Sequence, residues 1–153
     1  MQKIGVGQSI QILANVGVIA GIVFLGYEMR QNTQVARQEA YSSFAQSIND
    51  VNTTIMASPE LAAIIARASE GASRSEFSRA EQLQYDLAII GLVRVFEGHY
   101  QSLEDDIVDE SYFRTVSTGT GPWAQAYFRE YWPQVRPTFD PEFVEYFEEL
   151  LPE

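Results

Sequence analysis

An uncharged run of 24 residues, from Ile4 to Tyr27, constrains the fold of this chain more than any other feature. As an α-helix such a run measures about 36 Å at ~1.5 Å per residue, and a bilayer core is about 30 Å thick. Ten large aliphatic or Phe side chains lie between Ile10 and Leu25, and each favours insertion by roughly 0.3–0.6 kcal/mol. Only a few amides oppose them, so the run predicts one membrane-spanning helix.

Small and amide residues within this run share faces of the predicted helix. Gly17 and Gly21 form a Gly-x-x-x-Gly pair, and Ala14 lies one turn before Gly17. Small residues at this spacing let a second helix approach closely in lipid. Gln11 and Asn15 lie on a neighbouring stripe, where their amides could bond across the contact. We therefore expect these five residues to form a helix-packing face, although glycines are also common in membrane helices without such a role.

The flanks of the run argue against a cleaved signal peptide and bear on orientation. Only Lys3 precedes the run, and Glu28 follows it at once without a small-x-small cleavage site. Positive charges flank both ends, namely Lys3 with the amino group on one side and Arg30 with Arg37 on the other. The positive-inside rule slightly favours a cytoplasmic C-terminal domain, and the opposite orientation stays open.

The rest of the chain shows helical periodicity and no alternating strand pattern. Ser58-Pro59 and Asp140-Pro141 are helix starts, Ser78 to Glu81 is a capping box, and Gly71 is typical of a helix end. The expected helices cover residues 8–57, 59–70, 79–103, 110–115, 122–132 and 141–151. The sequence thus predicts an all-α fold, in which an anchor (residues 1–30) continues into an amphipathic helix packed with a small helical bundle (residues 31–153).

The helix expected at residues 79–103 is apolar on nearly all sides, which is typical of a buried central helix. Arg94 and Glu97 interrupt this pattern at i and i+3, and Asp86 lies two turns earlier. Because buried charges must be paired, we expect Arg94 and Glu97 to form a buried ion pair. Eleven of the 19 aromatic residues lie between Tyr112 and Phe147, and at helical spacing they predict a core or, as the alternative, a contact surface.

Composition bears on several classes of function. The chain has no Cys and one His, His99, so the sequence predicts no metal site, cofactor site or catalytic residue. The net charge of −11 is concentrated in residues 97–153, which hold three Arg against thirteen Asp and Glu. Nucleic-acid binding requires a basic surface, and none is present. We therefore expect a protein that is not an enzyme, uses no cofactor and binds no nucleic acid.

The junction Gly26-Tyr27-Glu28-Met29-Arg30-Gln31-Asn32-Thr33 resembles that of a loose group of uncharacterised bacterial proteins. In that group a single hydrophobic helix runs into a stretch like Tyr-x-x-x-Arg-Gln-Asn-Thr and then a helical domain. This chain departs from the pattern because only two residues separate Tyr27 from Arg30. The resemblance covers about the first forty residues and implies an architecture without an activity. With nine Arg against one Lys, it suggests a single-pass protein of a bacterial inner membrane.

Two kinds of function fit these features. The first is a membrane-anchored structural or accessory protein that associates through helix–helix contacts with itself, as a homo-oligomer, or with a larger membrane complex. The second is a membrane-tethered module that binds a small ligand or acts as a sensor, with a pocket between the third helix and the region of Trp123 and Trp132. A cavity with convergent polar groups would favour the second function, and a solid core would favour the first.

Overall fold

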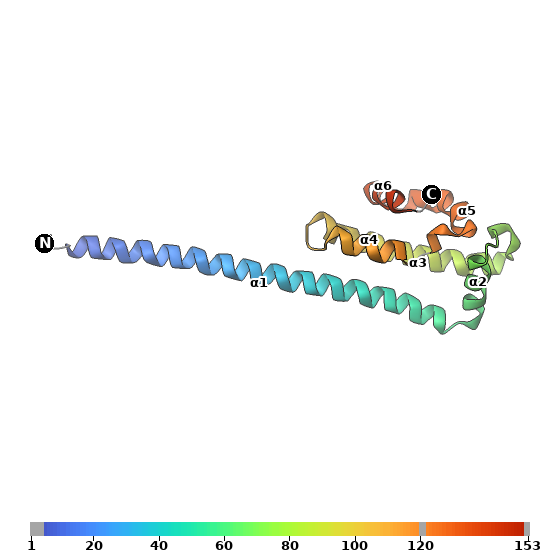
Figure 1. Cartoon of the computed structure of the whole chain (residues 1–153), viewed down its shortest axis with the longest axis horizontal. Helices are drawn as coiled ribbons and strands as arrows, with labels where there is room; N and C mark the ends of the chain where they lie inside the picture. The colour runs from blue at the N-terminus through green and yellow to red at the C-terminus, as the bar shows by residue number, and fades with distance from the viewer. Residues whose placement is uncertain (1–4, 120–121, 152–153) are drawn as a thin grey trace. The chain divides into compact units, whose positions relative to one another are not determined.

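The computed structural model describes residues 5–119 and 122–151, and every regular element in these ranges is helical. The predicted all-α fold with a long N-terminal helix is thereby confirmed. That helix, α1, runs from Val6 to Met56 without interruption (Figure 1). The chain divides into two compact units, residues 1–38 and 39–153. The border expected between residues 30 and 31 lies within α1, eight residues before the border between the units.

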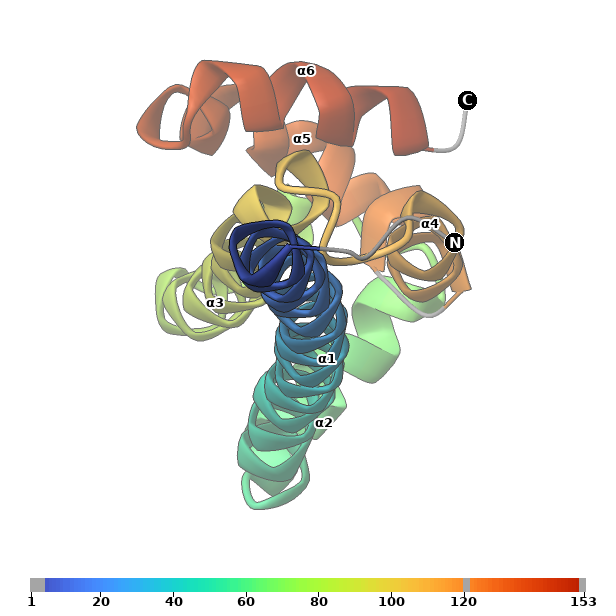
Figure 2. The same cartoon turned by 90° about the vertical axis from the view of Figure 1, so that its left-hand side faces the viewer.

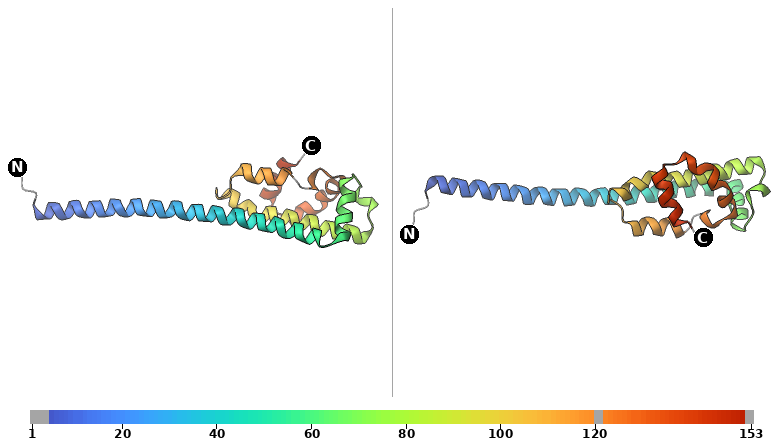
Figure 3. Two further views of the ribbon diagram at one scale, coloured as in Figure 1. Left: turned by 60° about the horizontal axis from the view of Figure 1, so that its bottom comes forward. Right: turned by 90° about the horizontal axis from the view of Figure 1, so that it is seen from above.

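The helix α2, Pro59–Ser69, starts at the predicted capping residue. Ser58 accepts a hydrogen bond from the backbone N–H of Leu61 at 3.2 Å, and Pro59 occupies the first helical position. Beyond the end of α2, Gly71 adopts a φ of +101°, a conformation that L-residues with a side chain rarely adopt. Ser58 and Pro59 start α2 directly after the turn at the end of α1, and Gly71 lets the chain turn again after α2 (Figures 1 and 3).

The helix α3, Arg79–Glu104, is the longest element that lies entirely in the second unit. Its start is the predicted capping box, in which the side chains of Ser78 and Glu81 each accept a backbone N–H of the other residue. A short 3₁₀ helix, η1 (Arg74–Glu76), precedes it. The expected range of residues 79–103 is therefore confirmed within one residue at its end.

The chain after α3 forms shorter helices. The helix α4, Glu110–Gly119, extends four residues beyond the expected end, and Thr120 and Gly121 of the expected loop lie outside the described residues. The 3₁₀ helix η2 (Pro122–Ala124) and the helix α5 (Ala126–Val135) replace the single helix expected there.

Pro133 does not end α5, as the sequence had suggested, but lies inside it. Pro133 lies in the last turn of α5, which then passes into a 3₁₀ helix, η3 (Arg136–Thr138). The proline ring therefore removes one hydrogen bond at the end of the helix and leaves the preceding turns intact. The last helix, α6 (Pro141–Leu150), begins as predicted. Asp140 caps it by accepting the backbone N–H groups of Glu142 at 2.9 Å and Phe143 at 3.2 Å.

Aromatic side chains form the core of the second unit, where α5 and α6 lie on one side of α3 and α4 (Figure 2). The ring of Phe44, from the end of α1 that belongs to this unit, stacks on Phe113 at 5.8 Å and meets Phe96 edge-on at 5.4 Å. The predicted aromatic core is confirmed, with these residues buried between Phe113 and Phe147: Phe113, Trp123, Tyr127, Phe128, Tyr131, Trp132, Phe139, Phe143 and Phe147.

The prediction that α3 is buried on most sides is wrong for one of its faces. Tyr85, Ile89 and Val93 are buried, but Leu83 and Leu87 expose 58% and 60% of their surface. Sequence periodicity cannot reveal this, because it shows that a face is apolar and not which neighbours cover it. The second unit therefore carries an uncovered apolar face.

Candidate functional site

The apolar segment of α1 is exposed along its whole length. Between Ile10 and Leu25 the large apolar side chains expose from 50% to 76% of their surface. Among the described residues one helix, which contains this segment, is long and apolar enough to cross a membrane. Apolar surface on this scale is unfavourable in water and marks a contact with lipid or protein. This segment is thus the first candidate functional site.

The five residues predicted to pack against another helix all lie on this segment. At about 100° per residue, Ala14, Gly17 and Gly21 fall within about 60° of the helix circumference, and Gln11 and Asn15 lie beside them. No atom lies within 4 Å of the position that a side chain would take at Gly17 or Gly21. This face is therefore open along the described chain, and its role in packing stays a prediction.

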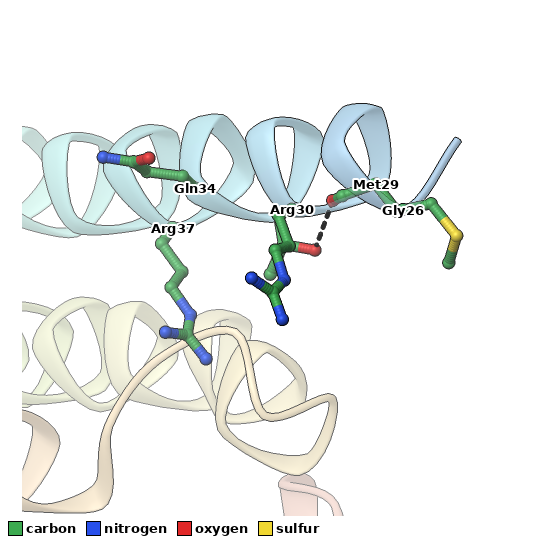
Figure 4. A pocket seen from close by; sticks show the side chains of 6 residues that line it. Gly26, Met29, Arg30, Gln34 and Arg37 are labelled. Atoms are coloured by element: carbon green, nitrogen blue, oxygen red, sulfur yellow. Dashed lines mark hydrogen bonds between the residues drawn. The ribbon is translucent and has the colours of Figure 1, made fainter. Parts of the chain in front are cut away.

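Two arginines mark the end of the apolar segment. Gly26, Arg30, Thr33 and Arg37 recur at steps of three or four residues, so they lie on one face of α1. Figure 4 shows Arg30 and Arg37 extending from the same side of the helix. Glu28 points about 160–200° away, because it lies two residues before Arg30. The segment thus ends in a face of α1 that carries two arginines.

Arg94 and Glu97 form the predicted ion pair, but the prediction that it is buried is wrong. The Arg94 side chain is 43% exposed and that of Glu97 is 20% exposed. Arg94 also donates to the backbone oxygen of Thr138 at 2.7 Å and lies 4.0 Å from the ring centre of Phe139. Glu97 accepts the backbone N–H of Asp140 at 2.7 Å. The pair is exposed because both side chains extend from the surface of α3 and bond to the backbone of the turn before α6.

The buried ion pair of this unit joins Arg74 of η1 to Asp86 of α3, with side chains 16% and 11% exposed. Asp86 is the buried charged residue of the described chain. Arg74 donates to it from Nε at 3.2 Å and Nη2 at 2.5 Å, and the Tyr127 hydroxyl donates at 2.9 Å. Hydrogen bonding to Asp86 raises the pKa of Arg74, while burial raises the pKa of Tyr127. Every partner in this cluster is satisfied, which is the pattern of a structural element.

The sequence did not reveal this cluster, although Asp86 indicated that a charged partner must exist. Asp86 interrupts an apolar helix and therefore needs a partner. Arg74 lies twelve residues earlier, before the start of α3, and no periodic pattern connects the two. Only the turn around η1 brings the guanidinium back to α3.

A hollow of about 290 Å³ lies in the second unit between α1, α2, α3 and η2. Its apolar walls consist of Val51, Ile55, Ile65, Ala88, Ile89 and Leu92. Three polar residues of its lining are joined in a chain. The Tyr85 hydroxyl donates to Gln125 Oε1 at 2.5 Å, and Gln125 Nε2 donates to Ser69 Oγ at 3.1 Å. Burial raises the pKa of Tyr85 to about 12. The hollow thus combines apolar walls with three polar residues that bond to one another.

The hollow lies only in part where the sequence suggested, because Pro122 and Gln125, which flank Trp123, line it. Trp123 and Trp132 are 4% and 5% exposed and pack into the core, so they cannot line an open pocket. Large rings at helical spacing fill the space between α5, α6 and α3, and the space left open lies instead beside α1 and α2. The third helix contributes to the lining, as expected.

The described residues contain no group of three or more His, Asp or Glu side chains placed to hold a metal ion. His99 is half-buried, its ring centre lies 4.8 Å from that of Phe44, and burial lowers its pKa. Comparison with known proteins adds no relative, because no family model, curated protein or solved structure matches the chain.

Proposed function

We propose that this protein is a single-pass protein of a bacterial inner membrane, with a structural or accessory role that it performs by helix–helix association. The observation that carries this proposal is the exposure of every large apolar side chain from Ile10 to Leu25 on one uninterrupted helix. A water-soluble helix of this composition would need to bury these side chains, whereas lipid accepts them on all sides. The same resemblance that links the junction at Tyr27 to Thr33 to bacterial membrane proteins supports the location.

Association in the membrane is assigned to the face formed by Ala14, Gly17 and Gly21. Lipid tails are as apolar as Leu side chains, so helices associate in a bilayer through close packing and hydrogen bonds and not through the hydrophobic effect. The absence of Cβ atoms at Gly17 and Gly21 permits close approach of two backbones. Gln11 and Asn15 can then bond across the contact. The partner is a second copy of the chain or a helix of a larger membrane complex.

The acidic second unit is assigned to the cytoplasmic side. Arg30 and Arg37 follow the end of the apolar segment, and positively charged residues beside a membrane helix favour the cytoplasmic side for the chain that follows. The acidic residues after position 96 favour contact with water or with a basic partner. The proposed role is not enzymatic and requires no cofactor or nucleic acid.

Gentle detergent extraction followed by native mass measurement tests the proposal on the full chain. We expect the protein in the membrane fraction, with a mass above that of one chain. The double variant Gly17→Leu/Gly21→Leu should reduce the association by about tenfold or more, because branched side chains keep the helices apart.

Gly26→Leu is the matched control for this experiment. It makes the same change about 140° around α1 from Gly21, so association should be retained. A monomeric wild-type protein that purifies from the cytosol without detergent would overturn both the anchor and the accessory role. Unchanged association of the double variant would overturn the assigned face.

A further inference from the structure

A second hollow adjoins the one described above. It has a volume of about 370 Å³, and Val51, Ile55 and Ala88 line both hollows. Leu61 and Leu87 form its other apolar walls, while Asp50 and Thr54 of α1 and Gln84 of α3 are its polar lining residues. Together the two hollows form a surface that is polar at one end, near Gln125, and mainly apolar at the other, near Leu87.

The polar end has hydrogen-bonding capacity to spare. The Gln125 amide has two N–H bonds, of which one faces Ser69 Oγ at 3.1 Å. The Tyr85 oxygen donates its hydrogen to Gln125 and keeps lone pairs that can accept one. A hydroxyl group at this position can therefore both donate and accept a hydrogen bond without breaking the Tyr85–Gln125–Ser69 chain.

Among the described residues, none that lines the hollow at the polar end is charged. A carboxylate or ammonium group there would lose its hydration without gaining a counterion, which is strongly unfavourable. A neutral hydroxyl or amide loses much less, because Gln125 and Tyr85 replace the bonds it made to water. The lining thus selects a neutral polar group.

The apolar end exposes surface that the described residues of the second unit leave uncovered. Leu87 is 60% exposed. Met56 and Leu83, which are close in sequence to lining residues, are 82% and 58% exposed. A hydrocarbon chain along Leu61 and Leu87 would remove part of this surface from water. We propose that the two hollows bind one neutral amphiphile, with its hydroxyl or amide head beside Tyr85 and Gln125 and its hydrocarbon tail along Leu61 and Leu87.

Photoaffinity labelling of the full chain in lipid nanodiscs tests this proposal. The probe is 1-decanol with a diazirine on a central carbon, and mass spectrometry locates the residues that it labels. We expect labels on α1 near Val51 and Ile55 and on α3 near Ala88. Added 1-decanol should compete, whereas equal aqueous concentrations of decanoate and decylammonium should not. Labelling confined to the apolar segment of α1, or equal competition by the charged analogues, would overturn the proposal.

The length of the alcohol tests the position of the tail. From 1-hexanol to 1-decanol the aqueous concentration needed for half competition should fall by up to about fourfold for each added methylene. If competition does not depend on length, the tail does not lie along Leu87, and a single amphiphile across both hollows is excluded.

Variants separate binding from folding. Ala88→Trp fills space at the wall shared by the hollows and should lower labelling by about tenfold. Gln101→Trp makes a similar change at an exposed position of α3 outside both linings, about 140° around the helix from Ala88, and should leave labelling within about twofold. Tyr85→Phe keeps the shape of the wall, so it should weaken competition by 1-decanol but not by decane. Equal competition by 1-decanol in wild type and Tyr85→Phe would contradict the assigned head position even if Ala88→Trp failed to fold.

Discussion

The guanidinium of Arg74 holds the carboxylate of Asp86 through two hydrogen bonds, from Nε at 3.2 Å and from Nη2 at 2.5 Å. The Tyr127 hydroxyl adds a third hydrogen bond to the same carboxylate at 2.9 Å. This geometry ties η1 and α5 to the middle of α3, and it makes Asp86 the polar centre of the second unit.

We expect Asp86→Ala to lower the free energy of unfolding by about 3 kcal/mol, because it leaves the Arg74 guanidinium buried without its counterion. Chemical denaturation of the variant and the wild type, both in the same detergent, measures the difference. The double variant Arg74→Met/Asp86→Leu should recover most of the loss, since it removes both charges and keeps apolar volume. Equal destabilisation by the single and the double variant would show that packing and not charge governs this site.

Arg94→Ala should cost much less, about 1 kcal/mol, because the ion pair to Glu97 is open to water and screened. The expected loss comes mainly from the hydrogen bond to the Thr138 oxygen and from contact with Phe139. The same denaturation experiment compares the free energy of unfolding of this variant with that of Asp86→Ala. A loss as large as that of Asp86→Ala would contradict the exposed geometry of the pair.

The raised pKa of Tyr85 predicts that the folded chain loses stability at alkaline pH. Its pKa is raised to about 12 in the folded chain, against about 10 for an unfolded tyrosine. The stabilisation that comes from keeping the hydroxyl neutral is therefore complete below pH ~10 and is lost as the pH rises towards about 12, with a slope of at most about 1.4 kcal/mol per pH unit. Across this pH range the free energy of unfolding should fall less steeply with pH for Tyr85→Phe than for the wild type. Identical slopes would show that Tyr85 ionises normally.

The orientation proposed for the second unit can be tested with one thiol. The chain has no Cys, so Gln134→Cys on the exposed side of α5 introduces a single reactive site. A maleimide that does not cross membranes should label this variant in bacterial cells only after the inner membrane has been permeabilised. Labelling in spheroplasts with an intact inner membrane would place the second unit on the outer face.

The local signals in the sequence predicted the elements well. Ser58-Pro59, the box of Ser78 and Glu81, and Asp140-Pro141 start helices where expected, because each signal acts through backbone groups one turn away. Pro133 is the exception, since a proline in a last turn removes one hydrogen bond without preventing the helix that precedes it.

The contents of the candidate site depended on contacts between distant residues. The burial expected for Arg94 was wrong because the turn at Thr138 accepts its guanidinium at the surface. The pocket expected near Trp123 and Trp132 reaches Pro122 and Gln125 beside Trp123 but opens towards α1 and α2, because the two rings themselves fill the core. Neither outcome follows from helical spacing, which fixes a face and not the element that covers it.

The sequence by itself determined the helical class, most of the helix starts and the presence of one apolar segment long enough to span a bilayer, because these depend on interactions within a few turns of the chain. The tertiary structure alone decided that Asp86 pairs with Arg74, that Leu83 and Leu87 remain uncovered, and that Tyr85 and Gln125 meet at a hollow. The physical reason is that burial and pairing depend on which distant surfaces pack together, and backbone propensity carries no record of that choice.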